Sequence, residues 1–160
     1  MLLALVTAAI AVVGTLLGSL ISGRFQERAA ERSVRVNHGE TIRRDRLEAV
    51  TALASAASDH RRTMWMRGDA LLKGAEAELI QSLRRDSHQT RSQVTRPLVA
   101  MRVLITDPAV RTAADRMITL TYAIRDNFGS TEELTAAREA AMVAHDQFVD
   151  TAARYLAQRA

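Results

Sequence analysis

The side chains that carry most enzymatic chemistry are few in this sequence and lie far apart along it. No histidine is part of an H-E-x-x-H or E-x-x-H metal motif, and there is no Gly-rich phosphate loop or credible Ser, His and Asp set. The chain has no cysteine, which excludes disulfides and thiolate zinc sites. We therefore predict a protein that is not an enzyme and that uses no cofactor or metal. The histidines are His38, His60, His88 and His145.

Basic charge comes almost entirely from arginine, since Lys73 is the single lysine among 22 basic residues. The net charge of +4 is modest, because the arginines alternate with Glu and Asp. That alternation is typical of a solvated helix surface rather than of a concentrated basic face. Aromatic residues, which stack on single-stranded nucleic acid, make up only 4% of the chain. We do not expect direct nucleic-acid binding.

The first 22 residues contain no Asp, Glu, Lys, Arg or His, and residues 2–21 read LLALVTAAIAVVGTLLGSLI. About 20 apolar residues of helix span a bilayer core. A cleaved signal peptide would need basic residues before a shorter apolar run, and neither condition is met. We therefore predict a retained transmembrane anchor over residues 1–23.

One face of this predicted anchor consists of small residues. Gly14, Gly18 and Ser22 recur at four-residue spacing, the small-x-x-x-small pattern that lets two helix backbones approach closely in lipid. This pattern predicts that the chain self-associates as a homo-oligomer or docks on the membrane span of a partner.

The segment that follows, residues 24–41, is predicted to be a basic stalk beside the membrane. Arginine on one flank of a span marks the cytoplasmic side. We therefore expect the N-terminus outside the cytoplasmic membrane, the rest of the chain in the cytoplasm, and the arginines against lipid headgroups. Gly39 is a weak point for helix formation and is a candidate hinge. The arginines that carry this prediction are Arg24, Arg28, Arg32 and Arg35.

Residues 42–160 show the three- and four-residue spacing of amphipathic helices joined by short turns. We expect the first helix to end at Gly68-Asp69 and the second to span residues 69–105. Asp107-Pro108 predicts the start of a third helix, and Ser130 caps a fourth. Short connections favour antiparallel neighbours. The fold class is therefore predicted to be all-α: a transmembrane helix continuing into an antiparallel bundle of about four helices.

The middle of the second helix is unusually polar, with the sequence RRDSHQTRSQ over residues 84–93. Pro97 follows, and a proline inside a helix removes a hydrogen bond and clashes with the preceding turn. We expect a kink or break near Thr95, and we interpret this stretch as a candidate partner surface, while a solvated mid-helix segment explains it equally simply. The candidate residues are Arg84, Arg85, His88, Arg91 and Arg96.

Several short stretches of the anchor and of the helices stand in a characteristic order: residues 11–18 (AVVGTLLG), Phe25-Gln26 with the Glu/Arg run that follows, residues 43–47, residues 102–104 with residues 106–108, Phe148-Val149 and residues 152–154. In these stretches the chain resembles the KilB-like small membrane proteins of actinobacteria, which are tied to the spread of streptomycete conjugative plasmids. The resemblance covers nearly the whole chain. It implies a membrane-anchored accessory factor in DNA transfer, with a membrane DNA-translocase-type transfer protein as its partner.

Two other functions fit the same arrangement of parts. A phage-type membrane lysis protein also combines an anchor with helices, but its tail must lie outside the cytoplasm, which the arginine flank opposes. A membrane-anchored scaffold or sensor would transmit a signal along the stalk and would need an output domain or a ligand pocket. We favour a non-enzymatic, single-pass membrane protein that acts through protein–protein interaction.

Overall fold

The computed structural model describes residues 38–158, which are almost entirely helical. Residues 38–72 form one helix. It is followed by α2 (Ala77–Leu104), α3 (Pro108–Ala123), the short 3-10 helix η1 (Ile124–Asp126) and α4 (Thr131–Ala157). The chain divides into two units, Met1–Thr41 and Ile42–Ala160, and the helical bundle belongs to the second. Within it, the prediction of an all-α fold with four main helices is confirmed.

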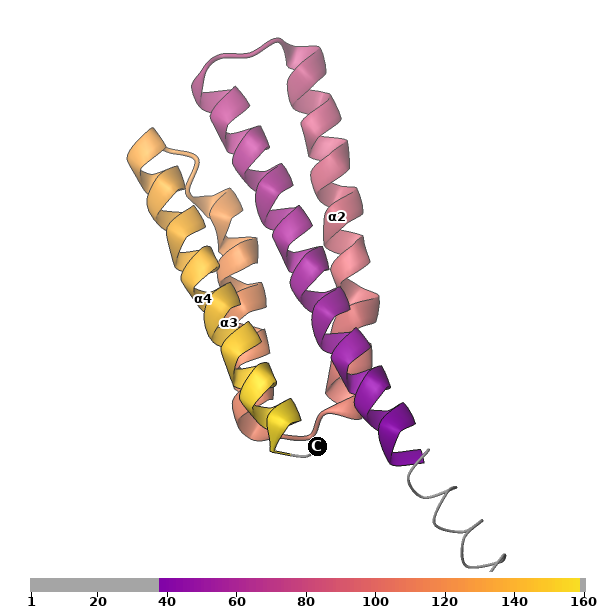
Figure 1. The fold of residues 1–160 in the computed structure, drawn as a ribbon. Coiled ribbons are helices and arrows are strands. Elements are labelled where there is room, and N and C mark those ends of the chain that lie inside the picture. Colours follow the sequence, from indigo (N-terminus) through magenta and orange to yellow (C-terminus); the bar gives the residue numbers. More distant parts are fainter. Residues whose placement is uncertain (1–37, 159–160) are drawn as a thin grey trace, which may run out of the picture. The chain divides into compact units, whose positions relative to one another are not determined.

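The four helices run up and down as an antiparallel bundle (Figure 1). Contacts fix the register of the first pair: Arg46 Nε donates to the carbonyl oxygen of Leu104 at 3.0 Å, and His60 lies beside Thr90. The partner of His60, which comes later on the first helix than Arg46, comes earlier on α2 than the partner of Arg46. This is the antiparallel pairing that short connections favour.

Two apolar clusters hold the bundle together. The larger contains residues from all four helices, including Leu53, Val94, Met117 and Phe148, which are fully buried. The smaller forms around Met64 with Ile124, Leu134 and Ala141, and Trp65 packs against it. Burying side chains of this size stabilises each by about 1.5–3 kcal/mol, which makes these stripes the main stabilising force.

Side-chain caps set the starts of α3 and α4 where the sequence predicts them. The carboxylate of Asp107 accepts hydrogen bonds from the backbone N–H groups of Ala109 and Val110 at 2.9 and 3.1 Å, and Pro108 occupies the first turn. Ser130 Oγ accepts from the N–H of Glu133 at 3.1 Å. These caps satisfy backbone donors that have no partner inside the helix.

The predicted stop at Gly68-Asp69 is wrong, because the helix continues to residue 72. Gly68 is a packing glycine: a Cβ at this position would lie 2.8 Å from the Phe128 ring and 2.9 Å from Leu134. The turn is made instead at Gly74, whose φ is +64°. The N–H of Gly74 donates to the carbonyl of Leu71 and that of Ala75 to the carbonyl of Ala70, which is a Schellman ending.

The second helix differs from its prediction for related reasons. It begins at Ala77 instead of residue 69, and it runs without a break through Pro97. The expected break near Thr95 is therefore wrong. Proline costs one backbone hydrogen bond, but buried Val94 and Met101 on either side of it hold α2 in the core. Gly39, the proposed hinge, is helical in the structure.

Among residues 38–158, no helix is long and apolar enough to cross a bilayer. The predicted anchor, residues 1–23, and the stalk as far as residue 37 lie outside the described residues.

The close approach at Gly68 generates a prediction for stability. Replacing Gly68 with Ala should lower the free energy of unfolding by about 1–3 kcal/mol, because the new methyl group overpacks against Phe128 and Leu134. Urea unfolding of the full chain in detergent, monitored by circular dichroism, measures this free energy.

Gly39 provides the matched control, since it lies in the same helix and a Cβ there meets nothing within 4 Å. Gly39→Ala should be neutral or stabilising by up to about 1 kcal/mol. Equal unfolding curves for Gly68→Ala and the unaltered chain would contradict the packing role of Gly68.

Candidate functional site

A layer of polar side chains crosses the middle of the bundle core. His60 is only 2% exposed, and its Nδ1 lies 3.0 Å from Thr90 Oγ1, which is in turn 2.9 Å from Thr63 Oγ1. The ring of Tyr122 meets the imidazole edge-to-face, with centroids 5.3 Å apart. The guanidinium of Arg91 lies 4.1 Å from the centroid of the Tyr122 ring. The layer thus joins the first helix, α2 and α3.

Burial lowers the pKa of His60 to about 4, and the positive charge of Arg91 acts in the same direction. The imidazole is therefore neutral at pH 7, and it is a weak base compared with one whose pKa is near the working pH. Its hydrogen bond to Thr90 satisfies one ring nitrogen in the core. These properties fit a structural histidine. Across residues 38–158, no group of three or more His, Asp or Glu side chains is placed to hold a metal ion.

The predicted partner residues on α2 are all exposed. Arg91 leans over Tyr122, and Arg84 lies near Arg67, where burial and the charge of Arg84 both lower the pKa of Arg67. Arg96 lies on the edge of a groove beside Pro97. Arg85 and His88 are exposed between these places.

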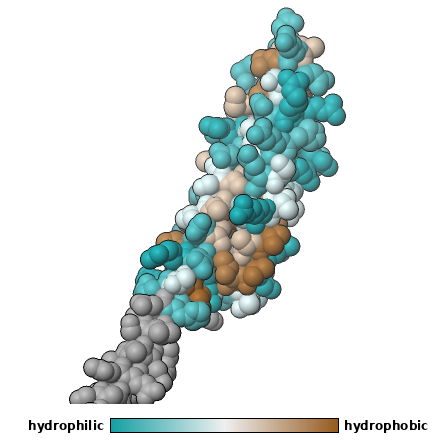
Figure 2. Space-filling view, turned by 90° about the vertical axis from the view of Figure 1, so that its right-hand side faces the viewer, coloured by the Kyte–Doolittle hydropathy of each residue, from teal (hydrophilic) through white to brown (hydrophobic). Residues whose placement is uncertain are grey.

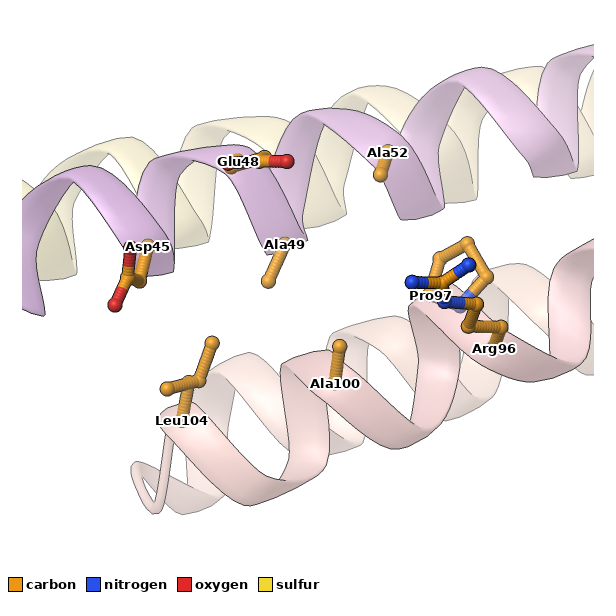
Figure 3. A pocket seen from close by; sticks show the side chains of 8 residues that line it. All are labelled: Asp45, Glu48, Ala49, Ala52, Arg96, Pro97, Ala100 and Leu104. Carbon is orange, nitrogen blue, oxygen red and sulfur yellow. The ribbon is translucent and has the colours of Figure 1, made fainter.

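The groove beside Arg96 runs between the first helix and α2, and its volume is about 540 Å³ (Figure 3). Its ends carry opposite charges. Asp45 lies beside Leu104 at one end, and Arg96 lies with Pro97 at the other. Small side chains form its floor. We call it the Asp45–Arg96 groove, and it is lined by Asp45, Glu48, Ala49, Ala52, Arg96, Pro97, Ala100 and Leu104.

Exposed apolar side chains adjoin this groove. Val99 and Val103 on α2 are 56% and 72% exposed, and they are one helical turn apart. Figure 2 shows that hydrophobic residues gather on the lower half of this side of the bundle, whereas the upper half is hydrophilic. A charged groove with apolar residues beside it is typical of a protein-docking surface.

A second groove, of about 590 Å³, lies between α3 and α4. Its charged side chains are Arg116 and Arg154, and no carboxylate lines it. We call it the Arg116–Arg154 groove, and its remaining lining residues are Pro108, Ala109, Thr112, Ala113, Gln147 and Thr151.

Sequence reasoning missed both grooves, although it found Arg96 and Pro97. The sequence did contain a signal for the Asp45–Arg96 groove. Its small lining residues Ala49, Ala52 and Ala100 leave space between the packed helices. The predicted lipid and self-association residues lie outside the described residues: Gly14, Gly18, Ser22, Arg24, Arg28, Arg32 and Arg35.

Comparison with known proteins gives a consistent result. The family profile described as KilB plasmid transfer protein matches residues 47–156, nearly the whole bundle. Protein KilB of Streptomyces lividans is 41% identical over 150 residues, which cover 94% of this chain and 97% of that protein. No solved structure matches the chain significantly.

Buried His60 makes the stability of the bundle depend on pH. Its pKa of about 4 in the folded state is below the ordinary value of 6.5, so the unfolded chain binds one more proton between these values. His60 has no effect above pH 6.5, and its destabilising effect grows to roughly 3 kcal/mol as the pH falls toward 4. Urea unfolding of the full chain at several pH values measures this.

Comparing two variants separates the effect of His60 on stability from that of the carboxylates, which titrate in the same pH range. His60→Gln should have a shallower loss of stability between pH 6.5 and 4, and His88→Gln, at an exposed position on α2, should keep the slope of the unaltered chain. Identical slopes for His60→Gln and the unaltered chain would refute a buried neutral imidazole.

Proposed function

This chain belongs to the KilB plasmid transfer protein family, and we propose that it is a non-enzymatic, membrane-anchored accessory factor of conjugative plasmid transfer. The observation that carries this proposal is the position of the family match, since residues 47–156 are almost the whole bundle. A function that resides in the bundle must use what the bundle offers. It offers helix surfaces, surface grooves and a buried histidine in a structural setting.

Membrane anchoring is the second part of the proposal, and the sequence supports it. Residues 1–23 are uncharged as far as Gly23 and long enough to span a bilayer. The arginines that follow, from Arg24 to Arg35, place the C-terminal side of the span in the cytoplasm and against anionic headgroups. The protein is then a single-pass protein of the cytoplasmic membrane, with its N-terminus outside.

Protein partners are the third part. Gly14, Gly18 and Ser22 support self-association within the membrane. The exposed polar side of α2, with Arg84, Arg85 and His88, is the surface we propose for a membrane DNA-translocase-type transfer protein. Such a partner is consistent with the plasmid transfer role of the family.

A plasmid transfer assay tests the function and the anchoring together. Loss of this chain from a plasmid-bearing strain should reduce plasmid spread to neighbouring cells, and the unaltered chain should restore it. A variant with Glu at Arg24, Arg28, Arg32 and Arg35 should fail to restore spread. Reversing the charge beside the span should place the C-terminal tail on the outer side of the membrane. Protease added outside spheroplasts should then digest its tail.

The control is a variant with Glu at Arg43 and Arg44, which lie further from the span. It should keep a protected tail. If spread is unaffected by loss of the chain, the transfer role is wrong. If the tail of the Arg24 to Arg35 variant stays protected and spread continues, the arginine flank does not set the topology.

A further inference from the structure

We propose that the Asp45–Arg96 groove binds the same groove of a second copy of the chain, in an antiparallel pair related by a two-fold axis. The inference deepens the self-association included in the proposed function, and it adds a defined contact in the bundle. It commits to one occupant, a second copy.

The charges of the groove support this occupant. Asp45 and Glu48 lie toward one end, and Arg96 lies at the other (Figure 3). Within residues 38–158, none of the three takes part in a salt bridge. Antiparallel pairing moves Arg96 of each copy to the acidic end of the other.

A two-fold interface needs a surface that complements itself, because the same residues contribute from both copies. The Asp45–Arg96 groove meets this condition, since it contains both signs of charge at separate ends. The Arg116–Arg154 groove does not meet it, because two copies would bring only arginines together. This difference favours the Asp45–Arg96 groove over the Arg116–Arg154 groove.

The apolar residues beside the groove supply the buried part of the contact. Val99 and Val103 lie on α2 in the same stripe as Arg96 and Ala100, at spacings of three and four residues. When α2 pairs antiparallel with its copy near Ala100, Val103 faces the stem of Arg96 from the other chain. Ala100 is a small residue that lines the groove beside these valines. The pair thus covers valines that are more than half exposed in the single chain.

Cysteine cross-linking tests the contact directly, because the natural chain has no cysteine. In membranes containing the full chain, Ala100→Cys should form a covalent dimer on mild oxidation, since this position lies near the two-fold axis. Val99→Cys, the adjacent position, should do the same if the axis is slightly displaced. Ala113→Cys, a matched alanine in the Arg116–Arg154 groove, should remain monomeric.

Charge exchange provides the second measurement, made in the Ala100→Cys background. Arg96→Glu should reduce the dimer yield about tenfold, because it places three carboxylates together at each end. Adding Asp45→Arg and Glu48→Arg to it should restore the yield. Arg116→Glu is the control with an equal charge change, and it should leave the yield unchanged.

Each other outcome overturns the inference. Absence of a dimer at both Ala100→Cys and Val99→Cys excludes the antiparallel contact. A ladder of oligomers that forms only when Ala100→Cys and Ala113→Cys are combined shows that one groove binds the other in a head-to-tail chain. Failure of the charge exchange to restore the dimer removes the role of the three charges. None of these results depends on plasmid spread, so the proposed function and this contact fail separately.

Discussion

Each helix of this bundle has one apolar stripe, and each stripe is removed from water only by the other three helices. The core is made of side chains of small and medium size, with Phe148 as its one fully buried aromatic residue. Short stripes and small residues require close approach, and the chain achieves this at Gly68, where the Phe128 ring lies against the helix backbone. The caps at Asp107 and Ser130 and the Schellman turn at Gly74 fix where each stripe begins and ends. The grooves are what this packing leaves at the surface.

The arginines are best understood through what they contact. Within residues 38–158, four guanidinium groups lie over aromatic rings, including Arg91 on Tyr122 at 4.1 Å and Arg138 on Trp65 at 4.9 Å. Such contacts let a long charged side chain cover the edge of the core while its head stays near water. Arg96 differs from these four, because it lies on the edge of a groove and, within residues 38–158, forms no salt bridge and lies over no aromatic ring.

Much of the fold followed from local rules, and the errors have a common physical cause. The starts at Asp107-Pro108 and Ser130 were predictable because a cap depends on residues within three positions. The stop at Gly68 was wrong because its glycine is required by Phe128, sixty residues away, and sequence does not reveal such a contact. The surroundings of the candidate residues on α2 were only partly predictable, since helix spacing places Arg91 and Arg96 on α2 but does not say what lies beside them.

We propose that the chain acts by docking on other proteins of plasmid transfer, and capture in living cells tests this proposal. Cells that carry the plasmid and the chain with a tag at Ala160 would be cross-linked, extracted with detergent and analysed by mass spectrometry. We expect a membrane DNA-transfer protein to be recovered with the chain, and less of it when Arg84 and Arg85 are replaced by Glu but not when Arg125 is. Recovery of the chain alone, with no transfer protein, would show that docking on such a protein is not how the chain acts.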